Sequence, residues 1–149
     1  MSELTVIRGK TRVQGECDVP LVAHRTTLMK RRWRGTAEDG REFGFDLEKP
    51  LGHGAAFFAD GETRYVIEQS PEEVLEIAVG TVEEAARVAW NLGNLHFGVQ
   101  VLANAVRVTE DPAVLQFLER EKINFRRVIG VFLPLSTGAS HHHAPHHHD

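Results

Sequence analysis

Short runs of β-branched and aromatic residues, separated by turn residues, occupy the first half of the chain. The runs are Leu4–Ile7, Thr26–Arg34, Glu42–Leu47, Ala55–Phe58 and Arg64–Glu68. Asp39-Gly40 and Asp60-Gly61 lie between them, and both pairs tolerate the positive φ angles of tight hairpins. This pattern predicts strands joined by hairpins, and therefore a small β domain.

The second half of the chain alternates between runs typical of strands and runs typical of helices. Val74–Val79 is mostly aliphatic and predicts a strand. Thr81 and Glu84 have the spacing of a capping box, and apolar residues then recur every three or four positions as far as Leu92. These features predict a helix that starts at Thr81 and ends near Leu92, with Gly93 as its left-handed terminator.

A second helix and three more strands are expected after the first helix. Asp111 suits an N-cap and Pro112 suits the first helical position, so a helix is predicted from Asp111 to about Lys122. The strands are predicted at Phe97–Leu102, Ala105–Val108 and Phe125–Leu133. The order β-α-β-β-α-β is that of a ferredoxin-like domain, in which an antiparallel sheet carries both helices on one face.

The predicted fold class is therefore α+β, in three parts. A small β domain over residues 1–70 is followed by a ferredoxin-like βαββαβ domain over residues 71–135. The polar segment Gln69–Glu72 between them contains a proline and is expected to be a hinge. Residues 136–149 have no periodicity, which predicts a disordered, histidine-rich tail.

The composition is that of a folded globular protein without disulfides. Of 149 residues, 42% are hydrophobic and 26% are charged, and no apolar stretch approaches the ~18 residues of a membrane span. We expect a cytoplasmic protein, because Met1–Gly9 lacks the apolar core of a signal peptide. Cys17 is the only cysteine, so a metal ion would have to be bound by nitrogen or oxygen.

The charge distribution argues against a general nucleic-acid binder, since the formal net charge is -4. One basic cluster is nevertheless present, with Lys30, Arg31, Arg32 and Arg34 around Trp33. This cluster is either a nucleic-acid face or the solvated side of a strand. The acidic residues that follow it favour the second interpretation.

Histidines gather at the C-terminus. Six of the nine lie in the last nine residues: His141, His142, His143, His146, His147 and His148. Neutral imidazole suits Ni(II), Cu(II), Zn(II) and Co(II), and six donors on one segment could hold one or two such ions. A purification tag is the alternative explanation, but the interruption by Ala144-Pro145 and the final Asp149 favour a natural tail.

His96 is the second candidate metal ligand. It follows the predicted helix terminator, where a side chain can project from the edge of a sheet. A single histidine in such a place is more often structural than a ligand. Because a metal ion takes about four to six donors, His96 can serve only if a second copy of the chain brings a second imidazole, with tail histidines or water completing the site. A metal site at His96 therefore requires a homodimer, whereas His24 and His53 are expected to be surface residues.

Catalytic motifs are missing from the sequence. It has no nucleophile elbow, P-loop or dinucleotide-binding fingerprint. Cys17 lies between Glu16 and Asp18, whose charges disfavour a thiolate. The protein is therefore not expected to be an enzyme.

The chain resembles the UreE family of urease accessory proteins, which are nickel metallochaperones. The resemblance lies in Leu92–His96 with Gln100 four places later, in Asp111 at the start of a helix, and in the histidine-rich end. The β domain of that family fits Arg32, Arg34, Asp39-Gly40, Leu51 and Gly54.

The resemblance implies a β-rich, peptide-binding-like first domain and a ferredoxin-like, metal-binding second domain. It also implies a homodimer that binds one Ni(II) between two copies of His96. The nickel would be cargo, delivered to the urease apoprotein complex alongside the accessory GTPase. Zn(II) or Cu(II) is expected to bind in vitro as well, because of the Irving–Williams order.

Some positions depart from the family pattern. Many relatives have histidine where this chain has Asn91 and arginine where it has Leu95, and some have a histidine pair where it has Glu110 and Pro112. The nitrogen ligands would therefore have to come from His96 and the tail.

Two other functions remain open. One is a metal-independent assembly chaperone that binds proteins through its β domain. The other is an RNA-binding module, since RNA-binding domains share the split βαβ topology. The missing aromatic signature on the third strand and the acidic second domain count against binding of nucleic acid.

Overall fold

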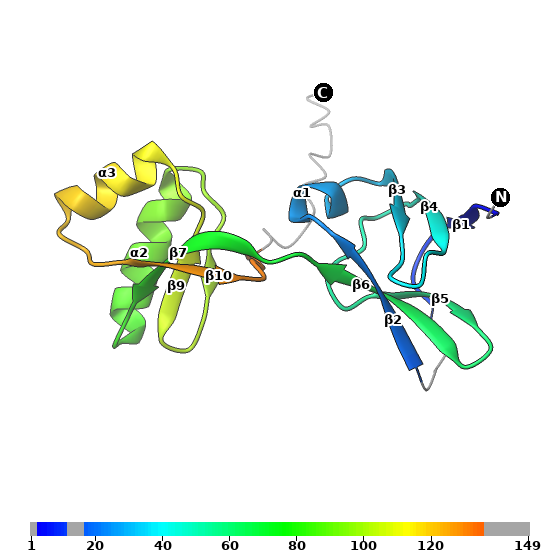
Figure 1. Cartoon of the computed structure of the whole chain (residues 1–149). Coiled ribbons are helices and arrows are strands. Elements are labelled where there is room, and N and C mark those ends of the chain that lie inside the picture. Colours follow the sequence, from blue (N-terminus) through cyan, green and yellow to red (C-terminus); the bar gives the residue numbers. More distant parts are fainter. Residues whose placement is uncertain (1–2, 12–16, 136–149) are drawn as a thin grey trace, which may run out of the picture. The chain divides into compact units, whose positions relative to one another are not determined.

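The computed structural model describes residues 3–11 and 17–135. These residues form two compact units, one ending at Pro71 and the other beginning at Glu72 (Figure 1). Each unit has a hydrophobic core of its own, and the α+β class is confirmed. The predictions for the tail and its six histidines lie outside the described residues.

The first unit contains two three-stranded sheets. One sheet consists, in spatial order, of β1 (Thr5–Ile7), β4 (Glu42–Asp46) and β3 (Arg32–Thr36). The other consists of β2 (Cys17–Ala23), β6 (Thr63–Gln69) and β5 (Ala56–Asp60). The β1–β4 and β2–β6 pairs are parallel, whereas β3–β4 and β5–β6 are antiparallel.

Alternation along the strands decides which side chains enter the core of the first unit. In β4, Phe43 and Phe45 are buried, and the residues between and beside them are not. Phe43 packs edge-on against Phe57 of β5, with ring centroids 5.0 Å apart, and Tyr65 of β6 lies in the same cluster. Both sheets therefore contribute aromatic residues to one core.

Two elements of this unit differ from the sequence prediction. The sequence predicts one strand over Thr26–Arg34, but Arg25–Leu28 form the short helix α1 and the strand starts at Arg32. The N-cap of α1 is His24, a residue type that is not among the preferred N-caps. Strand β2 is not predicted at all, because it contains Asp18 and Pro20, which strands usually avoid.

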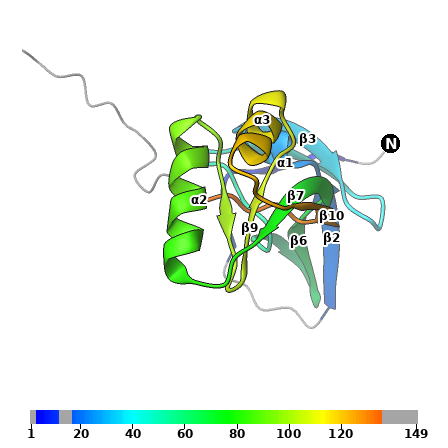
Figure 2. The same cartoon turned by 90° about the vertical axis from the view of Figure 1, so that its left-hand side faces the viewer.

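The second unit consists of β7 (Glu72–Ala78), α2 (Val82–Asn94), β8 (Gln100–Val101), β9 (Ala105–Val108), α3 (Pro112–Arg120) and β10 (Arg126–Gly130). Its four strands form an antiparallel sheet in the order β10-β7-β9-β8. Both helices cover the same face, because Leu92 of α2 and Leu118 of α3 share one core cluster with Leu75 and Ile77 of β7. Figure 2 shows α2 alongside β9, which it contacts.

Helix α2 starts where the sequence predicts and ends later. The Glu84 N–H donates to Thr81 Oγ1 at 3.1 Å, which confirms the N-cap. The Glu84 carboxylate accepts from the Gly80 N–H at 2.8 Å, one residue earlier than a capping box predicts. The helix runs through Gly93 and ends at Asn94, two residues beyond the predicted end, so the prediction that Gly93 is its left-handed terminator is wrong.

Helix α3 also starts as predicted. The Ala113 N–H donates to Asp111 Oδ1 at 2.9 Å, and Pro112 occupies the first helical position. The helix ends at Arg120, and Lys122 beyond it adopts a left-handed φ of 55°. No helix within residues 3–11 and 17–135 is long and apolar enough to cross a membrane.

An ion network lies on the sheet face opposite the helices. Glu76 of the central strand β7 accepts from Arg126 Nε at 3.0 Å and from Arg107 Nε at 2.8 Å. The register places Gln100, Arg107, Glu76 and Arg126 in one row across the four strands. Hydrogen bonds from Arg126 and then Arg107 hold the pKa of Glu76 below its usual value, although its side chain is only 10% exposed.

Candidate metal centre

His96 lies in the turn that ends α2. The Phe97 N–H donates to Leu92 O at 3.1 Å, and the His96 N–H donates to Gly93 O at 2.9 Å. These two bonds make a Schellman cap, in which His96 adopts a left-handed φ of 69°. Phe97 packs against the core of the unit. The backbone that carries the His96 imidazole is therefore fixed by the helix on one side and by the core on the other.

The His96 imidazole differs from those of the other histidines at residues 3–11 and 17–135. Nδ1 of His24 accepts from the Thr26 N–H at 3.2 Å, and Nδ1 of His53 accepts from the Gln69 N–H at 3.0 Å. A neutral imidazole whose Nδ1 accepts carries its proton on Nε2, so neither ring offers a free lone pair. His96 is exposed, and its ring has no hydrogen-bond partner in the described part of the chain. Of these three histidines, only His96 can bind a metal without giving up a hydrogen bond.

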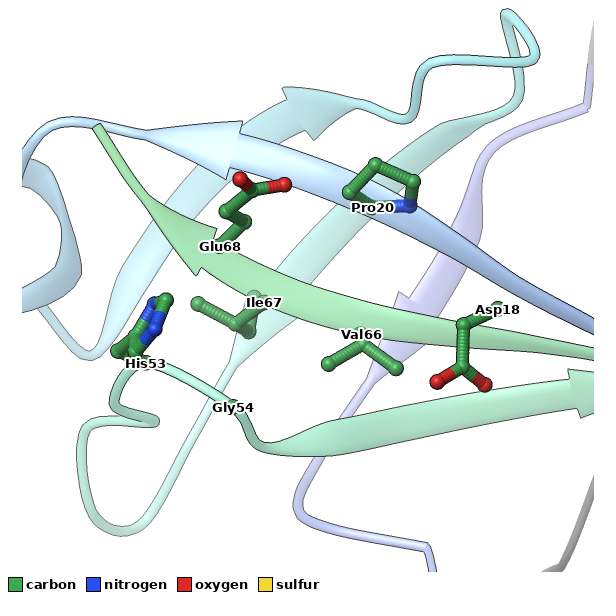
Figure 3. Close-up of a pocket in the computed structure, with 7 residues that line it drawn as sticks. All are labelled: Asp18, Pro20, His53, Gly54, Val66, Ile67 and Glu68. Atoms are coloured by element: carbon green, nitrogen blue, oxygen red, sulfur yellow. The ribbon is translucent and has the colours of Figure 1, made fainter. Parts of the chain in front are cut away.

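His53 lies beside a hollow in the first unit rather than at a metal site (Figure 3). The hollow has a volume of about 320 Å³ and is lined by Asp18, Pro20, His53, Gly54, Val66, Ile67 and Glu68. The carboxylate of Asp18 is already engaged, because Arg64 Nε donates to Asp18 Oδ1 at 2.8 Å. This hydrogen bond lowers the pKa of Asp18. The hollow therefore does not supply the donor set that a transition metal needs.

A complete metal site is not found within residues 3–11 and 17–135 of one chain. No group of three or more His, Cys, Asp or Glu side chains there could hold an ion. The single cysteine, Cys17, is exposed and forms no disulfide. Within its described residues, 72–135, the second unit offers one imidazole, that of His96, whereas a transition metal takes about four to six donors.

The chain that follows β10 returns to the far edge of the sheet. We name residues Val131–Leu135 the C-terminal strap. The Leu133 N–H donates to Gln100 Oε1 at 3.2 Å, and the Leu135 N–H donates to Val99 O at 2.7 Å. The strap thus holds Leu135, the last described residue, against Val99. Val99 is three residues along the chain from His96.

A glycine makes room for the strap. A Cβ built on Gly98 would come within 3.1 Å of Pro134 Cβ, so any side chain at this position would press on the strap. Phe132, the second residue of the strap, is 2% exposed. The strap is therefore part of the packed structure of the second unit.

Exposed apolar side chains lie on the segment that carries His96 and on the strap that is hydrogen-bonded to it. Leu95 precedes His96, Val101 follows Gln100, and Leu133 and Leu135 lie on the strap; all four are exposed. Exposed apolar residues that gather around one polar group are typical of an interaction surface.

The comparisons with known proteins identify the family. Residues 72–149 match the family described as the C-terminal domain of the UreE urease accessory protein, which is more than half of the chain. The chain belongs to the UreE family. It is 35% identical over 103 residues to the urease accessory protein UreE of Corynebacterium efficiens, covering 67% of this chain and 69% of that protein.

Other relatives extend over more of the chain. The UreE protein of Azotobacter vinelandii is 27% identical over 146 residues, covering 95% of this chain and 88% of that protein. The UreE protein of Beijerinckia indica is 31% identical over 120 residues, covering 76% and 69%. The resemblance to UreE is confirmed. Because UreE proteins are accessory chaperones of urease maturation, the prediction that this chain is not an enzyme is confirmed as well.

His96 follows the end of α2, as the sequence predicts, but the residue that terminates the helix differs from the prediction. The sequence places His96 after a glycine terminator, whereas His96 is itself the left-handed residue. The strap is the feature that the sequence analysis missed. Its contacts, those of Gly98 with Pro134 and of Gln100 with Leu133, join distant parts of the chain and are visible only in the fold.

Proposed function

We propose that the protein is a cytoplasmic nickel metallochaperone of urease maturation. Two copies of the chain would bind Ni(II) between their His96 imidazoles and deliver it to the urease apoprotein complex, together with the accessory GTPase. Membership of the UreE family supports this proposal. The structural observation that carries it is the exposed imidazole of His96, which has no hydrogen-bond partner among residues 3–11 and 17–135 and lies on a fixed helix cap.

The need for a second copy follows from the number of donors. The described residues of one chain supply one imidazole that is not already hydrogen-bonded, that of His96, and a twofold axis close to it would bring a second imidazole to the same ion. Association would also bury the exposed side chains of Leu95, Leu133 and Leu135, which favours a dimer through the hydrophobic effect. The metal and the apolar surface would then stabilise the same interface.

Chain length allows the tail histidines to reach the same ion. His141 follows Leu135 by six positions, and an extended chain spans at most ~3.3–3.6 Å per residue, which is about 20 Å in all. Leu135 is bonded to Val99, three residues from His96. We therefore assign the remaining nitrogen ligands, and weaker additional sites, to the tail: His141, His142, His143, His146, His147 and His148.

Such a site suits a carrier. Because His96 is exposed, ligands of a recipient protein can replace the imidazoles one at a time while the chaperone stays folded. Copper and zinc are expected to compete in vitro, since imidazole ligands do not select nickel over them. The assignment of nickel as the cargo therefore rests on the family.

Calorimetric titration with nickel chloride tests the role of His96. The variant His96→Asn removes the imidazole and keeps a residue that tolerates the φ of 69°. The matched control is His24→Asn, which removes another exposed imidazole and keeps a good N-cap on α1. We expect the wild type and the control to bind one tight nickel per two chains, and His96→Asn to lose this site. Unchanged tight binding in His96→Asn would remove His96 from the proposal.

A further inference from the structure

The sheet formed by β1, β4 and β3 has one face in the core of the first unit and one face turned away from it. Trp33 packs against the core, so Arg32 and Arg34 on either side of it along β3 lie on the outer face. The register places Arg34 and Val6 on opposite sides of Gly44, and Arg32 beside Asp46. We name the following residues the basic face: Val6, Arg8, Arg32, Arg34, Gly44 and Asp46.

Positive charge on the basic face is only partly neutralised. Asp46 is shared by two arginines: Oδ2 accepts from Arg8 at 3.1 Å, and Oδ1 accepts from Arg32 Nε at 3.1 Å. Arg34 has no ion-pair or hydrogen-bond partner among the described residues. Lys30 and Arg31 line an adjoining hollow with Arg32 and Asp46, and they add two more cations that are unpaired in the described part of the chain. Glu42 lies on the same face, two residues before Gly44 on β4. The surface therefore carries five cationic side chains against the carboxylates of Asp46 and Glu42, and its net charge is positive.

The centre of the basic face is hollowed. A Cβ built on Gly44 would come within 3.3 Å of Leu4 Cδ2, so the Leu4 side chain packs over this glycine. The hollow beside it has a volume of about 410 Å³. It is lined by Val6, Arg32, Trp33, Arg34, Gly44, Phe45 and Asp46. Val6 is 52% exposed and gives the hollow an apolar floor. The basic face can thus contact both the carboxylate and the methylene groups of an acidic side chain.

The aromatic residue of the basic cluster does not suit nucleic-acid binding. The Trp33 ring is stacked on Phe45, with centroids 4.0 Å apart and an angle of 11° between the planes, and it packs against the core. Single-stranded nucleic acids are usually bound by aromatic rings that are free to stack on bases. With the ring engaged in the core, the arginines favour carboxylates over a nucleic acid.

The spacing of the arginines specifies the shape of the ligand. Arg32 and Arg34 are two residues apart on one strand, which is ~6.6 Å along its axis. Side chains at every second position of an extended peptide repeat at the same distance. We propose that the basic face is the docking surface for an extended acidic segment of a partner protein. Alternate carboxylates of this acidic segment pair with Arg34 and with the two arginines that share Asp46, Arg8 and Arg32. The methylene groups of the segment contact Val6.

Binding of a labelled peptide of alternating glutamate and threonine to the full chain tests this proposal. The titration is followed by fluorescence anisotropy at low salt in the presence of EDTA, so that no metal takes part. Arg34→Gln is expected to weaken binding about fivefold, as loss of one exposed ion pair predicts, and Arg34→Glu to weaken it further. The matched control is Arg120→Gln, an exposed arginine at the end of α3.

The outcomes separate the possible ligands. Weaker binding in both Arg34 variants, unchanged binding in the Arg120→Gln control, and no binding of a lysine–threonine peptide are the expected results. Circular dichroism should show both Arg34 variants folded, since Arg34 has no partner to lose in the described part of the chain. Equal binding of the acidic peptide to Arg34→Glu, absence of binding to the wild type, or tighter binding of a short oligothymidylate would overturn the proposal. Because EDTA is present, none of these results depends on the nickel site.

Discussion

The length of chain between the strap and the tail histidines sets how strongly the tail can reinforce His96. Leu135 is held at Val99 by a hydrogen bond of 2.7 Å, and His141 follows six residues later. We predict that a flexible glycine–serine insertion after Gly138 weakens the tight nickel site without abolishing it. The imidazole of His96 and the tail histidines would all remain, and only the tether between them would change.

The magnitude follows from polymer statistics. The effective concentration of a flexibly tethered ligand falls roughly as the −3/2 power of tether length. Lengthening the six-residue tether to about eighteen residues should therefore lower the nickel affinity about fivefold, or about 1 kcal/mol of binding free energy.

Competition against a chromophoric chelator can measure a fivefold change in nickel affinity. The same segment appended after Asp149 is the control, because it lengthens the chain and leaves the tether unchanged. In the His96→Asn background the insertion should have no effect. Equal affinity with and without the insertion after Gly138, or an equal loss with the appended segment, would refute the reasoning.

Three further predictions concern stability, stoichiometry and pH. Glu76→Gln should lower the free energy of unfolding by about 2 kcal/mol at neutral pH, measured by urea denaturation, because Arg107 and Arg126 lose a charged partner. Since folding lowers the pKa of Glu76 from 4.5, its contribution is complete above that value and is lost as pH falls through the folded pKa, so the variant and the wild type should converge in acid. Deletion of Ser140–Asp149 should reduce the nickel bound per chain, measured by metal analysis after gel filtration, and keep the site at the dimer axis; complete loss would make the tail the primary site. Nickel affinity should fall as pH drops below about 6.5, since imidazole coordinates only when deprotonated, and calorimetry that showed no pH dependence would point to carboxylate ligands.

Features that depend on neighbours in sequence could be predicted, and features that depend on the core could not. Thr81 and Asp111 cap amides only two or three residues away, so the starts of α2 and α3 are visible in the sequence. The end of α2 is different. Its cap uses His96 rather than Gly93, because Phe97 packs into the core and fixes the turn there.

The candidate site shows the same division. His96 could be selected from its place in the chain and from the resemblance to UreE. That its ring has no hydrogen-bond partner in the described part of the chain, whereas the rings of His24 and His53 do, depends on the fold and could not be predicted. The bond between Leu135 and Val99 joins positions 36 residues apart and has no local signature. The basic cluster could be seen in the sequence. The sequence could not show that Asp46 pairs with Arg32 and with the distant Arg8, or that Arg34 is unpaired in the described part of the chain.

The most direct test of the nickel proposal uses the chain without Ser140–Asp149, in which His96 must act without the tail. Sedimentation analysis combined with metal analysis would count both chains and ions in the same particle. We predict a dimer that carries one nickel per two chains, and no bound nickel when His96→Asn is added. One nickel on a single chain, or a dimer that still holds nickel without the His96 imidazoles, would contradict a site shared between two copies.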